Sequence, residues 1–261
     1  MQQCRHIGVQ GLAAYTHIVA DCAPWVVFSN SLATDKSIWD AQVEAVSQRW
    51  NILRYDQRGH GASALPEGAV DFALLGADVI ALMDHFSIER AAYVGLSMGV
   101  PTGLSAVSQA PARITGLLLA DGQAKTAPGG GQQWRDRIAS VQQLGLEDFA
   151  RSTAERWLAD PQSPRRNTLE AMIAATPVAG FTACSLALAD FDLTDVLGGI
   201  TCPVLLVAGE RDGKLPETMQ LMAASIPGAD FASIANAGHV PCFECPEAFN
   251  AALLPFLESL T

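Results

Sequence analysis

The sequence lacks the long apolar runs and the basic clusters that mark membrane proteins and nucleic-acid-binding proteins. No apolar stretch approaches the roughly 18 residues that cross a bilayer as a helix, and residues 1–10 hold no run of signal-peptide length. Only 16 residues are Lys or Arg, against 27 that are Asp or Glu, and they are spread along the chain. Binding to nucleic-acid phosphates needs clustered cations. We therefore expect a cytoplasmic protein with neither a nucleic-acid nor a membrane partner.

The chain also lacks the regular cysteine spacing of a disulfide or zinc framework. Its six cysteines are scattered between positions 4 and 245. Cys242 and Cys245 have the two-residue gap of a redox or metal pair, but no second pair lies near them in the sequence to complete a zinc site. We therefore expect reduced, partly buried thiols and no metal.

Short β-rich runs alternate with longer amphipathic stretches, which is the pattern of a parallel sheet covered by helices. The apolar share of 49% is enough for a sizeable core. Strands are expected over residues 25–28, 51–55, 91–94, 114–119 and 203–207, and a further apolar run covers 230–235. Helices are expected over residues 72–86 and 249–257. Because the strand runs are continuously apolar, the sequence predicts an α/β fold whose mostly parallel sheet is covered on both faces.

One region, residues 122–193, interrupts this alternation. It contains no convincing strand, and it shows helical patches at 134–144, 146–157 and 167–175. Pro161 and Pro164 lie between the second and third patches, and Pro177 follows the third. We interpret it as a helical cap inserted into a core made of residues 1–121 and 194–261. The apolar positions of the cap helices fit either a core or an interface with a second copy, so a homo-oligomer stays open.

The sharpest chemical signal is the segment Gly95-Leu96-Ser97-Met98-Gly99. It matches the G-x-S-x-G pattern, follows an expected strand and precedes an expected helix, which is the context this motif requires. Such a serine lies on a strained turn with its hydroxyl exposed above the sheet, and the flanking glycines avoid collisions of Cβ atoms with neighbouring backbone. Ser97 is therefore the candidate nucleophile.

A serine hydroxyl needs a base to take its proton and an acid to orient that base. His239, in a loop after the apolar run at 230–235, is the candidate base, whereas His60 is expected to pack the loop under the site. Asp212, after the strand at 203–207, is the candidate acid, with Asp121 and Glu210 as alternatives. The order of Ser97, Asp212 and His239 along the chain is that of the serine hydrolases built on an α/β sheet.

A tetrahedral intermediate also needs two main-chain N–H donors for its oxyanion. Met98 follows the nucleophile at a helix N-terminus, where the helix dipole favours negative charge. The second donor is expected in the turn after the strand at 25–28, from Leu32, with Ser31 as the alternative.

Taken together, these segments resemble the 3-oxoadipate enol-lactonases, a branch of the α/β-hydrolases, over nearly the whole chain. The segments that carry the resemblance are Ser29-Asn30-Ser31-Leu32, Trp39-Asp40, Arg54 to Ser63, Gly95 to Gly99, Trp134 to Ile138, Glu155-Arg156-Trp157, Asp190 to Leu193, Gly209 to Asp212 and Ala237-Gly238-His239. The Asn-Ser-Leu turn and the cap segments point to the lactonase branch, whereas the other segments are common to the fold.

The resemblance implies a reaction and a set of substrate contacts. Such enzymes open a five-membered unsaturated lactone that bears a carboxylate, in the breakdown of aromatic compounds through 3-oxoadipate, without metal or cofactor. The resemblance places Trp134, Arg137, Arg156 and Trp157 of the cap near this small-molecule substrate. An arginine facing an apolar pocket suits a carboxylate, because it can donate two parallel hydrogen bonds.

Other reactions of the same fold stay open from the sequence. They are simple ester cleavage, opening of acyl-homoserine lactones, C–C bond hydrolysis and cofactor-free haloperoxidase chemistry. A binding module without activity would be expected to have lost part of the catalytic set, yet Ser97, Asp212 and His239 are all present. A fold by itself does not decide among these functions.

Overall fold

The apolar runs of the sequence form the strands of one mixed sheet. The computed structural model describes residues 5–261, which form an eight-stranded sheet in the order β1-β2-β4-β3-β5-β6-β7-β8. The strands are β1 (Arg5–Val9), β2 (Leu12–His17), β3 (Trp25–Ser29), β4 (Asn51–Tyr55), β5 (Ala91–Leu96), β6 (Ile114–Ala120), β7 (Val204–Gly209) and β8 (Asp230–Ile234). β1 and β2 pair antiparallel, as do β2 and β4, and all other neighbours are parallel.

Helices occupy most of the chain between the strands. They are α1 (Asp40–Val46), α2 (Phe72–His85), α3 (Gly99–Gln109), α4 (Gly130–Leu144), α5 (Glu147–Trp157), α6 (Arg166–Ala174), α7 (Val178–Ala189), α8 (Thr194–Leu197), α9 (Leu215–Ala224), α10 (Pro241–Glu244) and α11 (Pro246–Glu258). Two short 3-10 helices, η1 (Lys36–Trp39) and η2 (Pro111–Arg113), precede α1 and β6.

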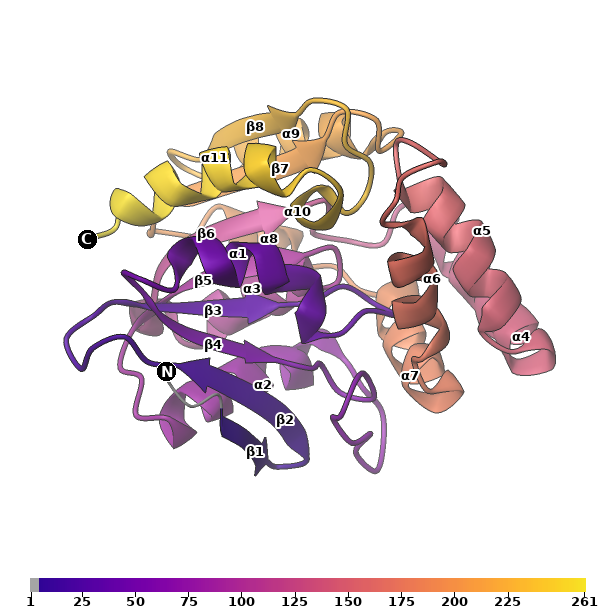
Figure 1. The fold of residues 1–261 in the computed structure, drawn as a ribbon, viewed down its shortest axis with the longest axis horizontal. Helices are drawn as coiled ribbons and strands as arrows, with labels where there is room; N and C mark the ends of the chain where they lie inside the picture. Colours follow the sequence, from indigo (N-terminus) through magenta and orange to yellow (C-terminus); the bar gives the residue numbers. More distant parts are fainter. Residues whose placement is uncertain (1–4) are drawn as a thin grey trace.

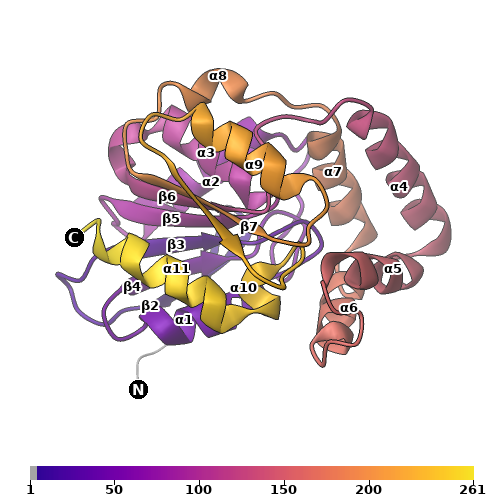
Figure 2. The ribbon, with the colours of Figure 1, turned by 90° about the horizontal axis from the view of Figure 1, so that it is seen from above.

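Both faces of the sheet are covered, because successive side chains of a strand point to opposite sides. Val26 and Phe28 of β3 belong to a buried cluster that includes Phe249 of α11. Val27, between them, belongs to a second cluster that includes Val79 of α2. Figure 2 shows α1 and α11 on one side of the sheet and α2, α3, α8 and α9 on the other. The predicted α/β fold with a sheet covered on both faces is therefore confirmed.

Helices α4 to α7 follow one another in the chain between β6 and α8. Figures 1 and 2 show these four helices gathered beside the sheet, at the end where the parallel strands finish. Within residues 122–193 the only β pairing among the described residues is an isolated bridge between Lys125 and Asp192. The division of the chain into a core and an inserted cap (the term used below for residues 122–193) stays a proposal that this arrangement supports.

Most expected elements are present with small shifts at their ends. The strand expected at 203–207 begins at Val204 and continues to Gly209, and the closing helix begins at Pro246 instead of residue 249. The sequence analysis does not predict the antiparallel β1–β2 pair, nor helices α1, α7, α8, α9 and α10. No single helix within residues 5–261 has the length and hydropathy to cross a membrane; α6 and α7 reach that threshold only as a pair, across a 95° bend.

Candidate active site

Ser97 lies in a sharp turn between β5 and α3. Its φ is +53°, in the left-handed region that costs a non-glycine residue about 1–3 kcal/mol. Two glycines make the turn possible: a Cβ at Gly95 would collide with the main chain of Gly99, and one at Gly99 would lie 2.6 Å from the carbonyl oxygen of Ser29. The Ser97 amide donates to the carbonyl of Ala120 at 2.7 Å. The strained turn is thus anchored to β6, and the serine side chain is left partly exposed.

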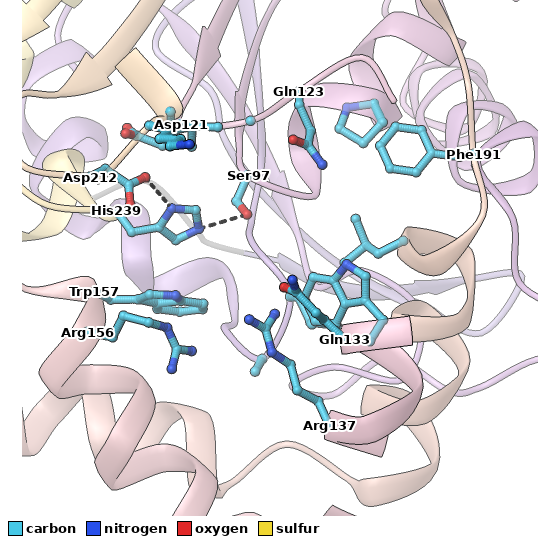
Figure 3. Close-up of a pocket in the computed structure, with 18 of the residues that line it drawn as sticks. Ser97, Asp121, Gln123, Gln133, Arg137, Arg156, Trp157, Phe191, Asp212 and His239 are labelled. Atoms are coloured by element: carbon cyan, nitrogen blue, oxygen red, sulfur yellow. Dashed lines mark hydrogen bonds and ion pairs between the residues drawn. The ribbon is translucent and has the colours of Figure 1, made fainter. Parts of the chain in front are cut away.

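His239 and Asp212 lie next to Ser97, although they are far from it in the sequence. The Nε2 atom of His239 is 3.0 Å from the Ser97 hydroxyl, and its Nδ1 atom is 2.6 Å from Oδ2 of Asp212. Of the three candidate acids, Asp212 is the one that contacts the imidazole. Glu210 instead accepts a hydrogen bond from the amide of Asn236, and Asp121 accepts one from the amide of Gly209. The structure thus joins the predicted serine, histidine and aspartate in one hydrogen-bonded chain (Figure 3).

The turn after β3 brings main-chain donors to the same place. Within the described chain, neither the Leu32 amide nor the Met98 amide donates a hydrogen bond to protein. Two buried side-chain amides hold the turn in place. The side chain of Gln57 donates to the main-chain carbonyl of Asn30, and the side chain of Asn30 donates to that of Thr34, each at 2.5 Å. Leu32 lines the cavity beside Ser97, whereas Ser31 does not.

A cavity of about 450 Å³ opens above Ser97, a volume suited to a small molecule. The four cap residues singled out from the sequence, Trp134, Arg137, Arg156 and Trp157, all line it. Sequence reasoning missed several other lining residues, which are Gln123, Gln133, Phe149, Leu188, Phe191, Lys214 and Leu215. Most lie on helices or loops whose facing no local motif reveals, although Phe191 falls in one of the segments that carried the resemblance.

The two arginines give the cavity its electrostatic character. In Figure 3 the guanidinium groups of Arg137 and Arg156 point toward one another, and neither forms an ion pair with a carboxylate of the described chain. Arg137 lies over the ring of Trp134, 4.6 Å from its centroid, and Arg156 donates to the hydroxyl of Thr153. Partial burial, and then the charge of Arg156, lower the pKa of Arg137. Two neighbouring cations, neither in an ion pair with the described residues, favour an anionic ligand.

His60 has the structural position expected of it. It is fully buried, and its Nδ1–H donates to the carbonyl of Arg58 at 2.9 Å. Burial lowers its pKa to about 4. Within residues 5–261, no group of three or more His, Cys, Asp or Glu side chains is arranged to hold a metal ion.

Comparisons with known proteins agree with this arrangement. Residues 26–252 match the model of a family described as the alpha/beta hydrolase family. The chain is 35% identical to 3-oxoadipate enol-lactonase 2 of Acinetobacter baylyi over 238 residues, covering 88% of this chain and 87% of the relative. It is 33% identical to 3-oxoadipate enol-lactonase 1 of the same organism, covering 91% and 90% of the two chains.

A solved structure gives the same result in three dimensions. The enol-lactonase from Burkholderia xenovorans LB400 superposes with a TM-score of 0.88 and 31% identity, over 97% of this chain and all of the other. The resemblance inferred from the motifs is thereby confirmed. This chain, a relative of the 3-oxoadipate enol-lactonases, belongs to the alpha/beta hydrolase family.

Proposed function

We propose that this protein is a serine hydrolase that opens 3-oxoadipate enol-lactone, in the breakdown of aromatic compounds. The observation that carries the proposal is the placement of two guanidinium groups, neither within ion-pair distance of a carboxylate of residues 5–261, in the same cavity as the hydrogen-bonded Ser97, His239 and Asp212. A reactive serine alone fits any ester, whereas the arginines favour a substrate with a carboxylate. The similarity to the two Acinetobacter baylyi lactonases supports the same substrate.

In this proposal Ser97 attacks the lactone carbonyl while His239 takes the hydroxyl proton. The 3.0 Å separation of the two side chains is within the reach of general-base catalysis. Asp212 accepts a hydrogen bond from Nδ1–H of His239, which leaves Nε2 free to accept the serine proton. The carboxylate also stabilises the imidazolium that forms during the attack.

The amides of Leu32 and Met98 are the proposed donors to the oxyanion. Both lie beside Ser97 and have no protein acceptor among the described residues. Met98 also precedes the first turn of α3, where the helix dipole favours negative charge. Loss of one such donor commonly lowers kcat by about 100- to 1,000-fold, because the charge exists only in the transition state.

Collapse of the tetrahedral intermediate breaks the ring C–O bond and leaves the acyl group on Ser97. The imidazolium of His239 gives its proton to the departing enol oxygen, and the enol then converts to the ketone. Because the leaving group stays attached to the acyl chain, it is retained in the cavity during the second step. Water, deprotonated by His239, then attacks the acyl carbon and forms a second tetrahedral intermediate. Its collapse breaks the bond between the acyl carbon and Oγ of Ser97, His239 returns the proton to Ser97, and the dicarboxylate product leaves.

The substrate carboxylate is assigned to Arg137 and Arg156. Arg137 is half-buried, and its guanidinium carbon lies over the ring of Trp134, a cation–π contact that limits the movement of the side chain. Charge-assisted hydrogen bonds to a carboxylate contribute about 1.5–3 kcal/mol, which is enough to separate this lactone from a neutral ester of similar size.

The test is a two-substrate assay of the purified protein, with 3-oxoadipate enol-lactone and a short p-nitrophenyl ester. The proposal predicts a kcat/KM for the lactone well above that for the ester, on the order of 10⁵ M⁻¹s⁻¹ or more. The Ser97→Ala variant is expected to lose both activities by several orders of magnitude, because the triad acts as a unit. Ester cleavage without lactone opening would keep the serine mechanism and reject the substrate.

A further inference from the structure

Two aspartates lie at the ends of neighbouring strands under the proposed catalytic centre. Asp121 directly follows β6, and Asp212 lies in the loop after β7. Both border the cavity, and Figure 3 shows the two side chains close together. Asp121 is fully buried and has a φ of +44°, a backbone conformation uncommon outside glycine. The fold therefore holds a second carboxyl in a strained position beside the first, and the proposed mechanism does not use it.

The hydrogen bonds of Asp121 account for only one of its two oxygens. Oδ1 accepts from the amide of Gly209 at 2.8 Å, while the main-chain N–H of Asp121 donates to the carbonyl of Val207 at 2.9 Å. Oδ2 is buried and, as a deprotonated acceptor, has no partner within residues 5–261. Buried polar atoms without partners are rare and costly. A proton on Oδ2, donated to the neighbouring carboxylate of Asp212, removes that cost.

The surroundings decide which of the two carboxyls carries the proton. Two adjacent carboxylates cannot both ionise at low cost. Asp212 is partly exposed, accepts a hydrogen bond from His239 and lies near the positive charge of Arg156. Among the described residues, Asp121 has a single amide donor, Gly209, and no neighbouring cation. The other titratable side chain near it, the buried thiol of Cys242, brings no charge, because burial raises the pKa of that thiol.

The pKa of Asp121 is shifted in the corresponding direction. Burial, and then the charge of Asp212, raise the pKa of Asp121 well above its usual value, and a hydrogen bond shared with Asp212 adds to the rise.

We infer that Asp121 is a neutral carboxylic acid at neutral pH that donates a hydrogen bond from Oδ2 to the carboxylate of Asp212. Asp121 is thus a positioning residue: it fixes Asp212, which in turn orients His239. The catalytic consequence rests on the proposed hydrolase function, whereas the protonation state does not.

Asparagine reproduces the neutral acid, and this gives a sharp test. In Asp121→Asn the amide oxygen can accept from Gly209 and the amide N–H can donate to Asp212. Asparagine also tolerates positive φ. We expect this variant to keep kcat within a few-fold of the wild type for whichever substrate the wild type hydrolyses. Asp121→Ala is expected to lower kcat about 10- to 100-fold with little change in KM, because the imidazole is less firmly oriented.

A measurement independent of activity follows the proton itself. The infrared spectrum of the wild type in D₂O at neutral pH should contain the carbonyl stretch of a protonated carboxyl, and this band should be lost in Asp121→Asn. If the lost band is instead that of a carboxylate, or if kcat falls as far in Asp121→Asn as in Asp121→Ala, the inference is wrong.

The infrared comparison of the wild type with Asp121→Asn tests the protonation of Asp121 even if Asp121→Ala fails to fold. If the wild type hydrolyses neither lactone nor ester, the proposed function fails, while the difference spectrum still tests the pairing of the two carboxyls.

Discussion

The amide N–H of His239 donates a hydrogen bond to the main-chain carbonyl of Trp157, with 2.7 Å between nitrogen and oxygen. The two side-chain rings are also in contact, with centroids 4.9 Å apart and planes tilted by 41°. Trp157 is the last residue of α5, so the end of a cap helix contacts the imidazole directly. Movement of the cap and the orientation of the proposed base are therefore mechanically linked.

The ring contact can be separated from the main-chain hydrogen bond by substitution. Trp157→Ala removes the ring but leaves the carbonyl, and we expect kcat for the ester to fall about tenfold because the imidazole gains freedom. Trp157→Phe keeps an aromatic face and should retain most of the activity. Steady-state kinetics of both variants separates the effect of the ring contact from that of the main-chain hydrogen bond, and thermal unfolding checks that both variants fold. A rise in KM alone, with unchanged kcat, would limit Trp157 to substrate binding.

Removal of Arg137 should affect charged substrates selectively. We expect Arg137→Ala to lower kcat/KM for the carboxylate-bearing lactone about 10- to 100-fold, which corresponds to the loss of charge-assisted hydrogen bonds. Activity on a neutral ester should change little. Arg135, exposed on the same helix and outside the cavity lining, supplies the matched control, since Arg135→Ala changes the net charge equally. Equal losses on the two substrates would show that Arg137 supports the cavity wall instead of binding the carboxylate.

The site residues that could be predicted from the sequence are those marked by a local motif or by their order along the chain. Ser97 was found because the strained turn demands glycines at fixed positions, and His239 and Asp212 because each follows a strand at the same edge of the sheet. The proton on Asp121 was beyond prediction, since it depends on the burial of one side chain and on the charge of a residue brought near only by folding.

The parts of the fold that were missed have physical reasons as well. Helix α7 (Val178–Ala189) is apolar on exposed as well as buried positions, with Val178 and Leu186 facing outward. Its sequence therefore lacks the helical spacing of apolar and polar residues by which an amphipathic helix is predicted. The β1–β2 hairpin is short, and its strands combine polar and apolar residues without the continuous apolar run that identified the central strands.

Removal of one partner of the buried ion pair between Arg58 and Asp78 should strongly destabilise the protein. Nε and Nη2 of Arg58 each donate to a different oxygen of Asp78 at 2.6 Å, and both side chains are less than a tenth exposed. Asp78→Ala leaves the guanidinium buried and unpaired, so we expect the free energy of unfolding to fall by about 3–5 kcal/mol. Urea unfolding measures this change. Asp148→Ala breaks the exposed pair with Arg151 and should cost less than about 1 kcal/mol; similar losses would contradict the argument.

His60 should make the protein less stable in mild acid. Its Nδ1–H is bound to the carbonyl of Arg58, and Nε2 is buried without a partner among the described residues, so protonation there is unfavourable. Burial lowers the pKa from 6.5 to about 4. Below pH 6.5 the unfolded chain therefore binds a proton that the folded chain refuses, and stability is lost as the pH falls toward 4, at about 1.4 kcal/mol per pH unit. His60→Asn keeps an N–H donor but cannot titrate. Urea unfolding at pH 7 and pH 5 should show the stability advantage of the wild type over this variant shrinking by about 2 kcal/mol; an advantage equal at both pH values would mean that His60 takes up its proton equally in both states.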